Sequence, residues 1–293
     1  MDVLVAVLRQ ASIYATMALG FIVVYRTSRV LNLAHPGLVL VMGFVTVALL
    51  PPLADARESP LQVTLTLVGV MLLAGAIGAA LYYLFIRPMS GESRIAIIMM
   101  TLAMLFLAEA SAQLVWSGQS LFIPLPGNTT RYDLLGSSVR LFDLLPMVGA
   151  AALYAGVGWF YQRSRYGVQM RAVAEQPGLA ARRGVDIDLI GALSWAAAGG
   201  LAVVAVVMTG MQAPVSPLMV SITLAGFTVA LVGGLDSLTG AIPAALLVAG
   251  SQVLVIRYVD QQLGEAVPYL VLLAVLVWKP WGLAGTVEEL DRV

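Results

Sequence analysis

The sequence predicts an all-α, polytopic integral membrane protein with about eight or nine transmembrane helices. Of its 293 residues, 60% are hydrophobic and only 11% are charged, and the mean hydropathy is +0.93. Soluble domains do not have such a composition. Apolar runs close to the roughly 20 residues that a bilayer crossing needs recur along the whole chain. These runs leave no room for a sizeable soluble domain, so residues 1–293 are expected to form a single transmembrane domain.

Nine apolar runs define the expected spans. They lie at about 11–25, 30–50, 61–86, 94–115, 143–161, 189–211, 220–235, 240–258 and 264–279. The first is short unless residues 3–10 extend it, and Arg9 favours an interfacial start for those residues. The run at 220–235 is also short. If it crosses the bilayer there are nine spans, and if it is re-entrant there are eight.

The arginines predict the orientation of the chain. Residues 163–188 carry five of them, and connections rich in Lys and Arg stay on the cytoplasmic side of a membrane. Counting backwards from this cytoplasmic segment places Arg87 and Arg94 inside. The same count places the Pro51–Pro60 turn and residues 117–142 outside. Because residues 117–142 are rich in proline and glycine, they are expected to form a structured external loop.

The cytoplasmic segment 163–188 is predicted to contain two short helices. GVQMRAVAE, residues 167–175, permits one helix, and PGLAARR, residues 177–183, permits a second. Pro177 suits the first turn of a helix, and Gly184 can end it in a left-handed cap. Two short helices between spans indicate a rigid docking element. The alternative is an ordinary positively charged cytoplasmic loop.

The composition excludes several kinds of chemistry. The chain has no cysteine, which excludes disulfides and thiolate metal sites. His35 is its one histidine and Lys279 its one lysine, and neither H-E-x-x-H nor a phosphate-binding P-loop is present. The sequence therefore shows no catalytic set and no metal site. The net charge of zero and the absence of a basic stripe exclude nucleic acid as a partner.

A first candidate for the substrate pathway lies at the start of the second run, in the sequence NLAHPG, residues 32–37. Asn32, His35 and Gly37 surround a proline at membrane depth, which predicts a broken helix whose freed polar groups face a cavity. The alternative is that Asn32 and His35 only join two helices by hydrogen bonds.

A second candidate is the sequence GFTVALVGGLDSLTGAIP, residues 226–243. Gly233 and Gly234 break any helix, and Asp236 is expected to cap the amide groups that follow, with Ser237 as an additional acceptor. The alternative is a plain turn between two helices.

The third candidate, Glu109, lies well inside the run at 94–115. A charged group at that depth costs about 2.5–3.5 kcal/mol, so it is expected to face the bundle interior or a water-filled cavity. Three roles stay open for Glu109: it lines the pathway, pairs with another subunit, or sits protonated in a packed core.

These segments resemble the permease subunits of bacterial ATP-binding-cassette (ABC) importers of the branched-chain (hydrophobic) amino acid uptake family. The first resemblance lies in residues 171–175, with Pro177 and Gly184. The second is an N-F-A-H-G sequence matched at Asn32 and His35, with Pro36 where the family has glycine. The third is a G-G-x-x-S-x-x-G-A sequence, matched by Gly233, Gly234, Ser237, Gly240 and Ala241.

The resemblance implies that segment 163–188 docks into a groove on an ATPase subunit. The residues expected to couple the two proteins are Arg171, Ala174, Glu175, Pro177, Leu179, Ala181, Arg182, Arg183 and Gly184. The implied partners are a homologous second permease subunit, two cytoplasmic ATPase subunits that hold ATP and Mg, an external solute-binding protein and membrane lipid. The implied location is the bacterial cytoplasmic (inner) membrane, and this chain itself is expected to bind no cofactor. The implied solutes are branched-chain or related small amino acids, amides or carboxylates.

Two other function classes remain possible on the sequence alone. A secondary transporter or channel without an ATPase would need coupling groups of its own, and only Glu109, His35 and Asp236 are available. A membrane scaffold that transports nothing would make the likeness of segment 163–188 to a coupling loop accidental.

Overall fold

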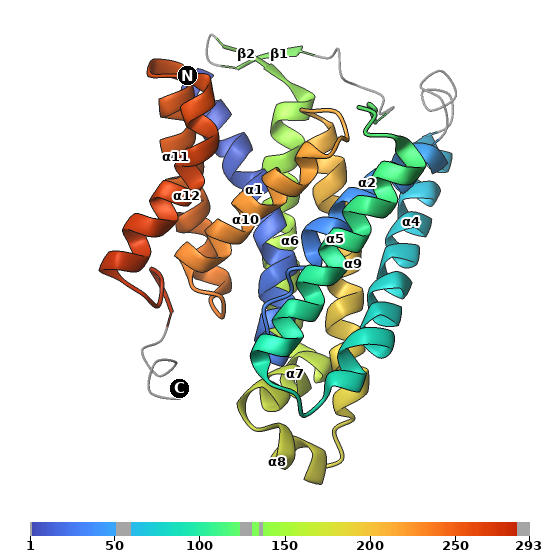
Figure 1. The fold of residues 1–293 in the computed structure, drawn as a ribbon. Coiled ribbons are helices and arrows are strands. Elements are labelled where there is room, and N and C mark those ends of the chain that lie inside the picture. The colour runs from blue at the N-terminus through green and yellow to red at the C-terminus, as the bar shows by residue number, and fades with distance from the viewer. Residues whose placement is uncertain (1, 51–59, 124–130, 135–136, 286–293) are drawn as a thin grey trace. The chain divides into compact units, whose positions relative to one another are not determined.

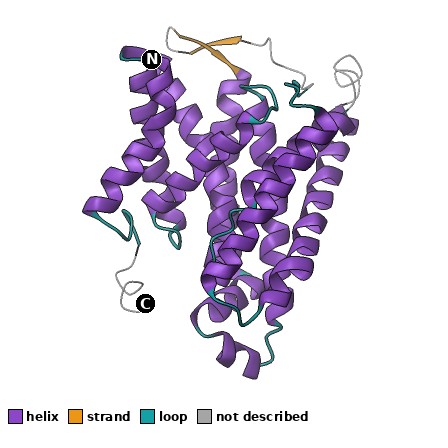
Figure 2. Cartoon of the chain, viewed as in Figure 1, coloured by secondary structure: helices purple, strands orange, loops and turns teal. Residues whose placement is uncertain are grey.

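The computed structural model describes residues 2–50, 60–123, 131–134 and 137–285, and these are almost entirely helical (Figures 1 and 2). Seven described helices are long and apolar enough to cross a membrane. They are α1 (Asp2–Ser28), α4 (Pro60–Leu81), α5 (Arg94–Trp116), α6 (Leu141–Arg163), α9 (Ile187–Gly210), α11 (Leu238–Tyr258) and α12 (Gln261–Trp278). Two shorter apolar helices are α2 (His35–Leu49) and α10 (Leu218–Gly233). The prediction of an all-α polytopic membrane protein is confirmed.

Each of the nine predicted runs corresponds to one of these helices, but the first run was predicted too short. Helix α1 begins at Asp2 and continues without a break through Arg9. Arg9 is tolerated within the helix because its guanidinium lies 2.8 Å from the carboxylate of Asp143 in α6. Helix α10 has 16 residues and is about 24 Å long, shorter than a hydrocarbon core of about 30 Å. The nine-span and eight-span alternatives for this run both stay predictions.

The described parts of segment 117–142 are structured. β1 (Arg131–Leu134) and β2 (Ser137–Arg140) form a short antiparallel ribbon. Leu121 and Val215 exchange two backbone hydrogen bonds of 2.9 and 2.7 Å, which joins the chain beyond α5 to the turn after α9. Residues 124–130 and most of the Pro51–Pro60 turn lie outside the described residues.

The chain forms two compact units. The first comprises residues 1–22, 127–154 and 222–293, and the second comprises residues 23–126 and 155–221. Helices α1, α6 and α10 each begin in one unit and end in the other. The expectation of a single domain over residues 1–293 stays a prediction.

In the second unit, α4 and α9 pack closely because small residues line their contact. A Cβ atom added to Gly78 would collide with the carbonyl group of Trp195, and one added to Gly199 would collide with that of Ala74. Such contacts bring two helix backbones together in an apolar environment. Beyond Leu81, α4 continues as a π-helical turn, Tyr82–Ile86, and a 3-10 turn, Arg87–Met89.

In the first unit, α1, α10 and α11 share a core of small and aliphatic side chains. Phe21 and Phe227 contact each other with ring centroids 4.9 Å apart. The Tyr14 hydroxyl donates a hydrogen bond of 2.5 Å to the buried Gln252 side chain. These helices therefore pair their few buried polar groups inside the unit, as an apolar surrounding requires.

Candidate functional site

The predicted pair of short helices is present in segment 163–188. Helix α7 spans Arg165–Glu175 and helix α8 spans Pro177–Arg182. Helix α7 begins two residues earlier than predicted because Ser164 is its N-cap, and the Ser164 hydroxyl accepts a hydrogen bond of 2.8 Å from the Gly167 amide.

Helix α7 is fixed against the end of α6. A Cβ atom on Gly167 would lie 2.5 Å from the carbonyl oxygen of Phe160 and 2.6 Å from the Cα of Tyr161, so only glycine allows this approach. The Arg171 guanidinium donates a hydrogen bond to the carbonyl oxygen of Tyr161. Met170 and Val173 are buried on the same helix. The face of α7 that makes these contacts is thus part of the packed protein.

Tyr161 connects α7 with the end of α1. Its side chain is buried, and its hydroxyl donates a hydrogen bond of 2.9 Å to the carbonyl oxygen of Val23. The Arg26 guanidinium lies 4.7 Å from the centre of the Tyr161 ring. The sequence analysis did not single out Tyr161. Its position could have indicated this role, because Tyr161 is an aromatic residue at the junction of an apolar run and a basic segment.

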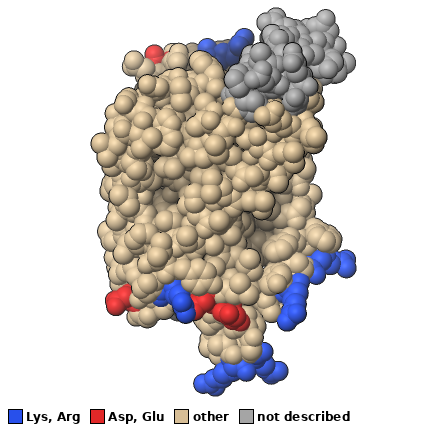
Figure 3. All heavy atoms as spheres, turned by 90° about the vertical axis from the view of Figure 1, so that its right-hand side faces the viewer, with Lys and Arg blue, Asp and Glu red and all other residues tan. Residues whose placement is uncertain are grey.

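Helix α8 is presented to the surroundings. Leu179 is 52% exposed, and Arg182, Arg183 and Ala181 are also exposed, whereas Ala180 is buried. On the face drawn in Figure 3, Lys and Arg side chains gather at the lowest point, where Figure 1 places α8. Helix α8 and the residue that follows it therefore expose one large apolar side chain, Leu179, beside two cations.

The end of α8 is shaped by Gly184. This residue has a φ of +82°, and the Val185 amide donates a hydrogen bond of 3.1 Å to the carbonyl oxygen of Ala180. The predicted left-handed cap is confirmed. Two residues later, the Asp186 carboxylate accepts a hydrogen bond from the Leu189 amide and caps α9.

The remaining predicted coupling residues lie on or between the two helices. Ala174 is partly buried on α7, Glu175 is exposed at its end, and Pro177 is exposed in the first turn of α8. That these residues contact an ATPase stays a prediction.

The predicted break at Asn32–Gly37 is present, and its polar groups are buried. Helix α1 ends at Ser28 and α2 begins at His35, while Asn32 and His35 are 2% and 1% exposed. The side-chain amide oxygen of Asn32 accepts a hydrogen bond of 3.1 Å from the Ala34 backbone amide. A Cβ atom on Gly37 would lie 2.7 Å from the Cβ of Ala108 in α5. The hydrogen bond is local and the contact of Gly37 is steric, so the pathway role and the alternative of a hydrogen-bonded join between two helices both stay predictions.

The predicted break at Gly233 and Gly234 is also present, and Ser237, which was predicted as an additional acceptor, takes the capping position predicted for Asp236. Helix α10 ends at Gly233, and Gly234 has a φ of +95°. The hydroxyl of Ser237, not the carboxylate of Asp236, accepts a hydrogen bond of 2.9 Å from the Gly240 amide. Ser237 directly precedes the first residue of α11, which is the N-cap position, and Asp236 lies one residue too early.

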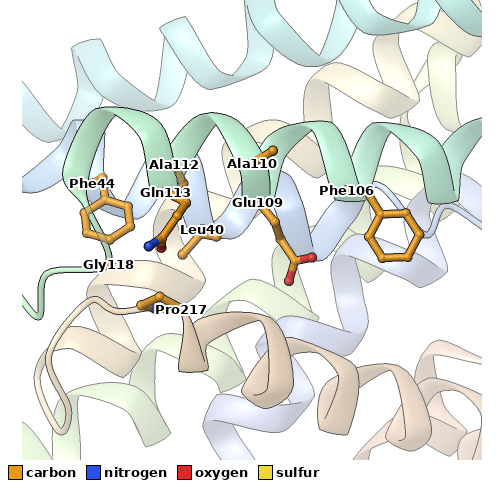
Figure 4. Close-up of a pocket in the computed structure, with 9 residues that line it drawn as sticks. All are labelled: Leu40, Phe44, Phe106, Glu109, Ala110, Ala112, Gln113, Gly118 and Pro217. Atoms are coloured by element: carbon orange, nitrogen blue, oxygen red, sulfur yellow. The ribbon is translucent and has the colours of Figure 1, made fainter.

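Glu109 lines a cavity of about 350 Å³ in the second unit, drawn in Figure 4. The side chains of Glu109 and Gln113 leave α5 on the side where Pro217 lies (Figure 4). The other predicted pathway residues do not line this cavity. Its lining consists of Leu40, Phe44, Phe106, Glu109, Ala110, Ala112, Gln113, Gly118 and Pro217.

The helices and the α7–α8 element define a multi-pass membrane protein whose described chain carries a helical projection between two of its spans. The family described as "Branched-chain amino acid transport system / permease component" matches residues 3–276, and the chain belongs to this family. That description names a permease and no enzyme.

Several curated relatives carry the same kind of name. The chain is 27% identical over 292 residues to the high-affinity branched-chain amino acid transport system permease protein BraD of Pseudomonas aeruginosa, covering 96% of this chain and 94% of the relative. It is 23% identical over 290 residues to the permease protein LivH of Escherichia coli, with the same coverage. It is 26% identical over 301 residues to a probable branched-chain amino acid transport permease protein LivH of Methanocaldococcus jannaschii, covering 95% and 92%. No solved structure matches the chain significantly.

Proposed function

We propose that this chain is the permease subunit of an ABC importer in a bacterial cytoplasmic membrane. It forms the translocation pathway for branched-chain or related small amino acids, amides or carboxylates that a solute-binding protein delivers. The observation that carries the proposal is the α7–α8 element, in which one helix is fixed to the membrane domain and the next is exposed. The names of the relatives support the choice of solute.

The contacts of this element suit the transmission of a movement. A displacement of α8 reaches α7 through Gln176, and α7 is tied to Tyr161 by the Arg171 hydrogen bond. Tyr161 in turn contacts α1 at Val23. A rigid chain of packed and hydrogen-bonded groups carries coupling between distant sites. Closure of the ATPases on ATP would thereby move the ends of α1 and α6 and change the side to which the pathway opens.

The proposed partners are a homologous second permease, two cytoplasmic ATPases and the solute-binding protein. ATP and Mg bind to the ATPases in this scheme. The outer surfaces of several spans suit lipid or the second permease, because large apolar side chains are exposed there. Examples are Leu114, Val277 and Trp278, which are 84%, 82% and 92% exposed.

Purification of the chain from its native membrane in mild detergent tests the proposal. We expect ATPase subunits to co-purify and the loaded solute-binding protein to stimulate ATP hydrolysis by the complex. Uptake of solute by the chain alone in proteoliposomes, without any ATPase, would instead support the secondary transporter. If no ATPase co-purifies and the chain alone transports no solute, the result favours the membrane scaffold.

The orientation is tested with single cysteines, because the native chain has none. Gln176 between α7 and α8 and Ser120 beyond α5 are both exposed. In cells with a permeabilised outer envelope, an impermeant maleimide is expected to label Ser120→Cys and to spare Gln176→Cys until the cells are lysed. The opposite labelling would reverse the proposed topology.

A further inference from the structure

One face of α5 carries polar groups into an otherwise apolar cavity. Phe106, Glu109, Ala110 and Gln113 are spaced by three, four and seven residues, which places them on one side of a helix. Figure 4 shows the Glu109 carboxylate and the Gln113 amide on the same side of α5.

The remaining walls of this cavity come from elements other than α5. Leu40 and Phe44 belong to α2, and Pro217 belongs to the turn before α10. The ring of Phe44 stacks on Trp116 with centroids 5.0 Å apart and an interplanar angle of 11°. The volume of about 350 Å³ lies within the range of about 300–1,000 Å³ typical of small-molecule sites. An apolar pocket with two convergent polar groups is the usual form of such a site.

Glu109 lies deep in its span. It follows Arg94 by 15 residues and precedes Trp116 by seven, so it is about 22 Å and about 10 Å from the two ends of α5. Arg94 is the only other charged residue of this helix. None of the ion pairs formed between described residues involves Glu109. A carboxylate at this depth is stabilised by a cation that enters the cavity.

We propose that Glu109 binds the α-ammonium group of an amino acid solute, with Gln113 as a second polar contact and Phe44, Leu40 and Phe106 around the solute's apolar side chain. This assignment rests on the proposed permease function and makes it narrower. A carboxylate in an apolar cavity forms a strong, charge-assisted hydrogen bond with an ammonium group. The Glu109 carboxylate cannot form such a charge-assisted hydrogen bond with a solute that lacks an ammonium group, such as an amide or a simple carboxylate. Amino acids, not amides or carboxylates, are therefore the solutes of this cavity.

The test measures binding to the assembled permease–ATPase complex in lipid nanodiscs without the solute-binding protein. The two probes are radiolabelled leucine and 2-hydroxy-4-methylpentanoate, which keeps the side chain and carboxylate of leucine but lacks its ammonium group. The variants are Glu109→Gln, which removes the charge, and Glu109→Asp, which keeps it. Glu265→Gln is the matched control, because Glu265 is an exposed carboxylate in α12, outside the cavity.

The wild-type complex is expected to bind leucine at least about tenfold more tightly than the hydroxy acid. Glu109→Gln should weaken leucine binding by a similar factor and abolish this preference, whereas Glu109→Asp and Glu265→Gln should keep it. The proposal is overturned if the wild type shows no preference for leucine, or if Glu109→Gln keeps the preference. A Glu109→Gln complex that assembles poorly but retains the preference would show that Glu109 pairs with a neighbouring subunit, which also overturns the proposal. ATP hydrolysis stimulated by the loaded binding protein, measured on the same wild-type complex, reports separately on the proposed function.

Discussion

Helices α7 and α8 are neighbours in the sequence, yet α7 is packed against the rest of the protein and α8 is largely exposed. Helix α7 buries Met170 and Val173 and brings Gly167 against the backbone of α6. Helix α8 buries only Ala180 and leaves Leu179 52% exposed. The difference indicates that α7 is packed into the protein, while α8 has an exposed surface available to the proposed ATPase partner.

The local sequence explains how α8 keeps its shape without extensive packing. With six residues, it is far shorter than an isolated helix that is stable in water. Pro177 fixes the backbone of its first turn, and Gly184 closes its end through the hydrogen bond from Val185 to Ala180. Helix α8 is therefore held by its two ends, and α7 by its face.

The largest effect on stability is expected where α7 meets α6. Gly167→Ala adds a methyl group 2.5–2.7 Å from backbone atoms of Phe160 and Tyr161, which cannot move aside as a flexible side chain would. We expect a loss of about 1–3 kcal/mol in the free energy of unfolding, because α7 must shift away from α6. The measurement is chemical unfolding of the permease in detergent.

Gly158→Ala is the control for this change. Gly158 lies on α6, and a Cβ atom there would have no heavy atom within 4 Å. It should be neutral or slightly stabilising because alanine favours a helix. Equal stability of the two variants would mean that α7 is not seated on α6.

A smaller loss of stability and a larger loss of function are expected at the end of α8. Gly184→Val forces a β-branched residue to a φ of +82°, at a cost of about 1–2 kcal/mol. A Cβ atom at this position meets no neighbour within 4 Å, so the effect is one of backbone conformation alone. The loop should rotate, and ATP hydrolysis stimulated by the loaded binding protein should fall at least about tenfold. Binding of solute by the free binding protein should not change.

Gly178→Ala provides the contrast within the same helix. Gly178 lies inside α8 and also has no neighbour for a Cβ atom, but its φ is not positive. Alanine there should stabilise α8 by up to about 1 kcal/mol and leave the stimulated ATP hydrolysis intact. If Gly184→Val also leaves both hydrolysis and uptake intact, segment 163–188 is only a charged connection.

Most of the fold was predictable because membrane spans are selected by length and apolarity. All nine apolar runs are helical, and the cap at Gly184 and the helix break at Gly233 and Gly234 followed from glycine at the end of a helical pattern. The extension of α1 through Arg9 was not predictable, because it depends on Asp143, which lies 134 residues away in the sequence. Local sequence cannot reveal such a distant partner.

The candidate site was predictable in part. The short helices and the helix breaks are local features, and the structure confirms them. The role of Tyr161 was missed because it depends on the backbone of α1 and on Arg171, which the sequence does not place beside it. The burial of His35 was equally hidden, because it follows from the packing of α2 against its neighbours.

A modest effect is expected from removing the Tyr161 hydroxyl group. Tyr161→Phe deletes the hydrogen bond to Val23 and leaves the ring beneath Arg26. The expected loss is about 0.5–1.5 kcal/mol in the free energy of unfolding. Tyr166→Phe on the exposed surface of α7 is the control and should have no effect. If stimulated ATP hydrolysis falls for Tyr161→Phe alone, the link between α7 and α1 takes part in transmission; if both variants behave as the wild type, Tyr161 only fills space.

The smallest effect on stability is expected from reversing the charges of α8. This change also distinguishes most clearly between the roles of α7 and α8. Arg182 and Arg183 are exposed, so the double change Arg182→Glu, Arg183→Glu should alter the free energy of unfolding of the permease by less than about 0.5 kcal/mol. An acidic groove on an ATPase would, however, repel the new carboxylates, and association should weaken at least about tenfold at low salt. The wild-type affinity should itself decrease as ionic strength rises, because exposed charges are screened.

Arg257→Glu, an exposed change at the end of α11, is the control and should leave association unchanged. Pull-down of the ATPase by purified permease variants measures the difference. If the double variant binds the ATPase as strongly as the wild type, α8 does not present its cations to a partner. The greater exposure of α8 compared with α7 would then mean only that α8 connects α7 to the next span.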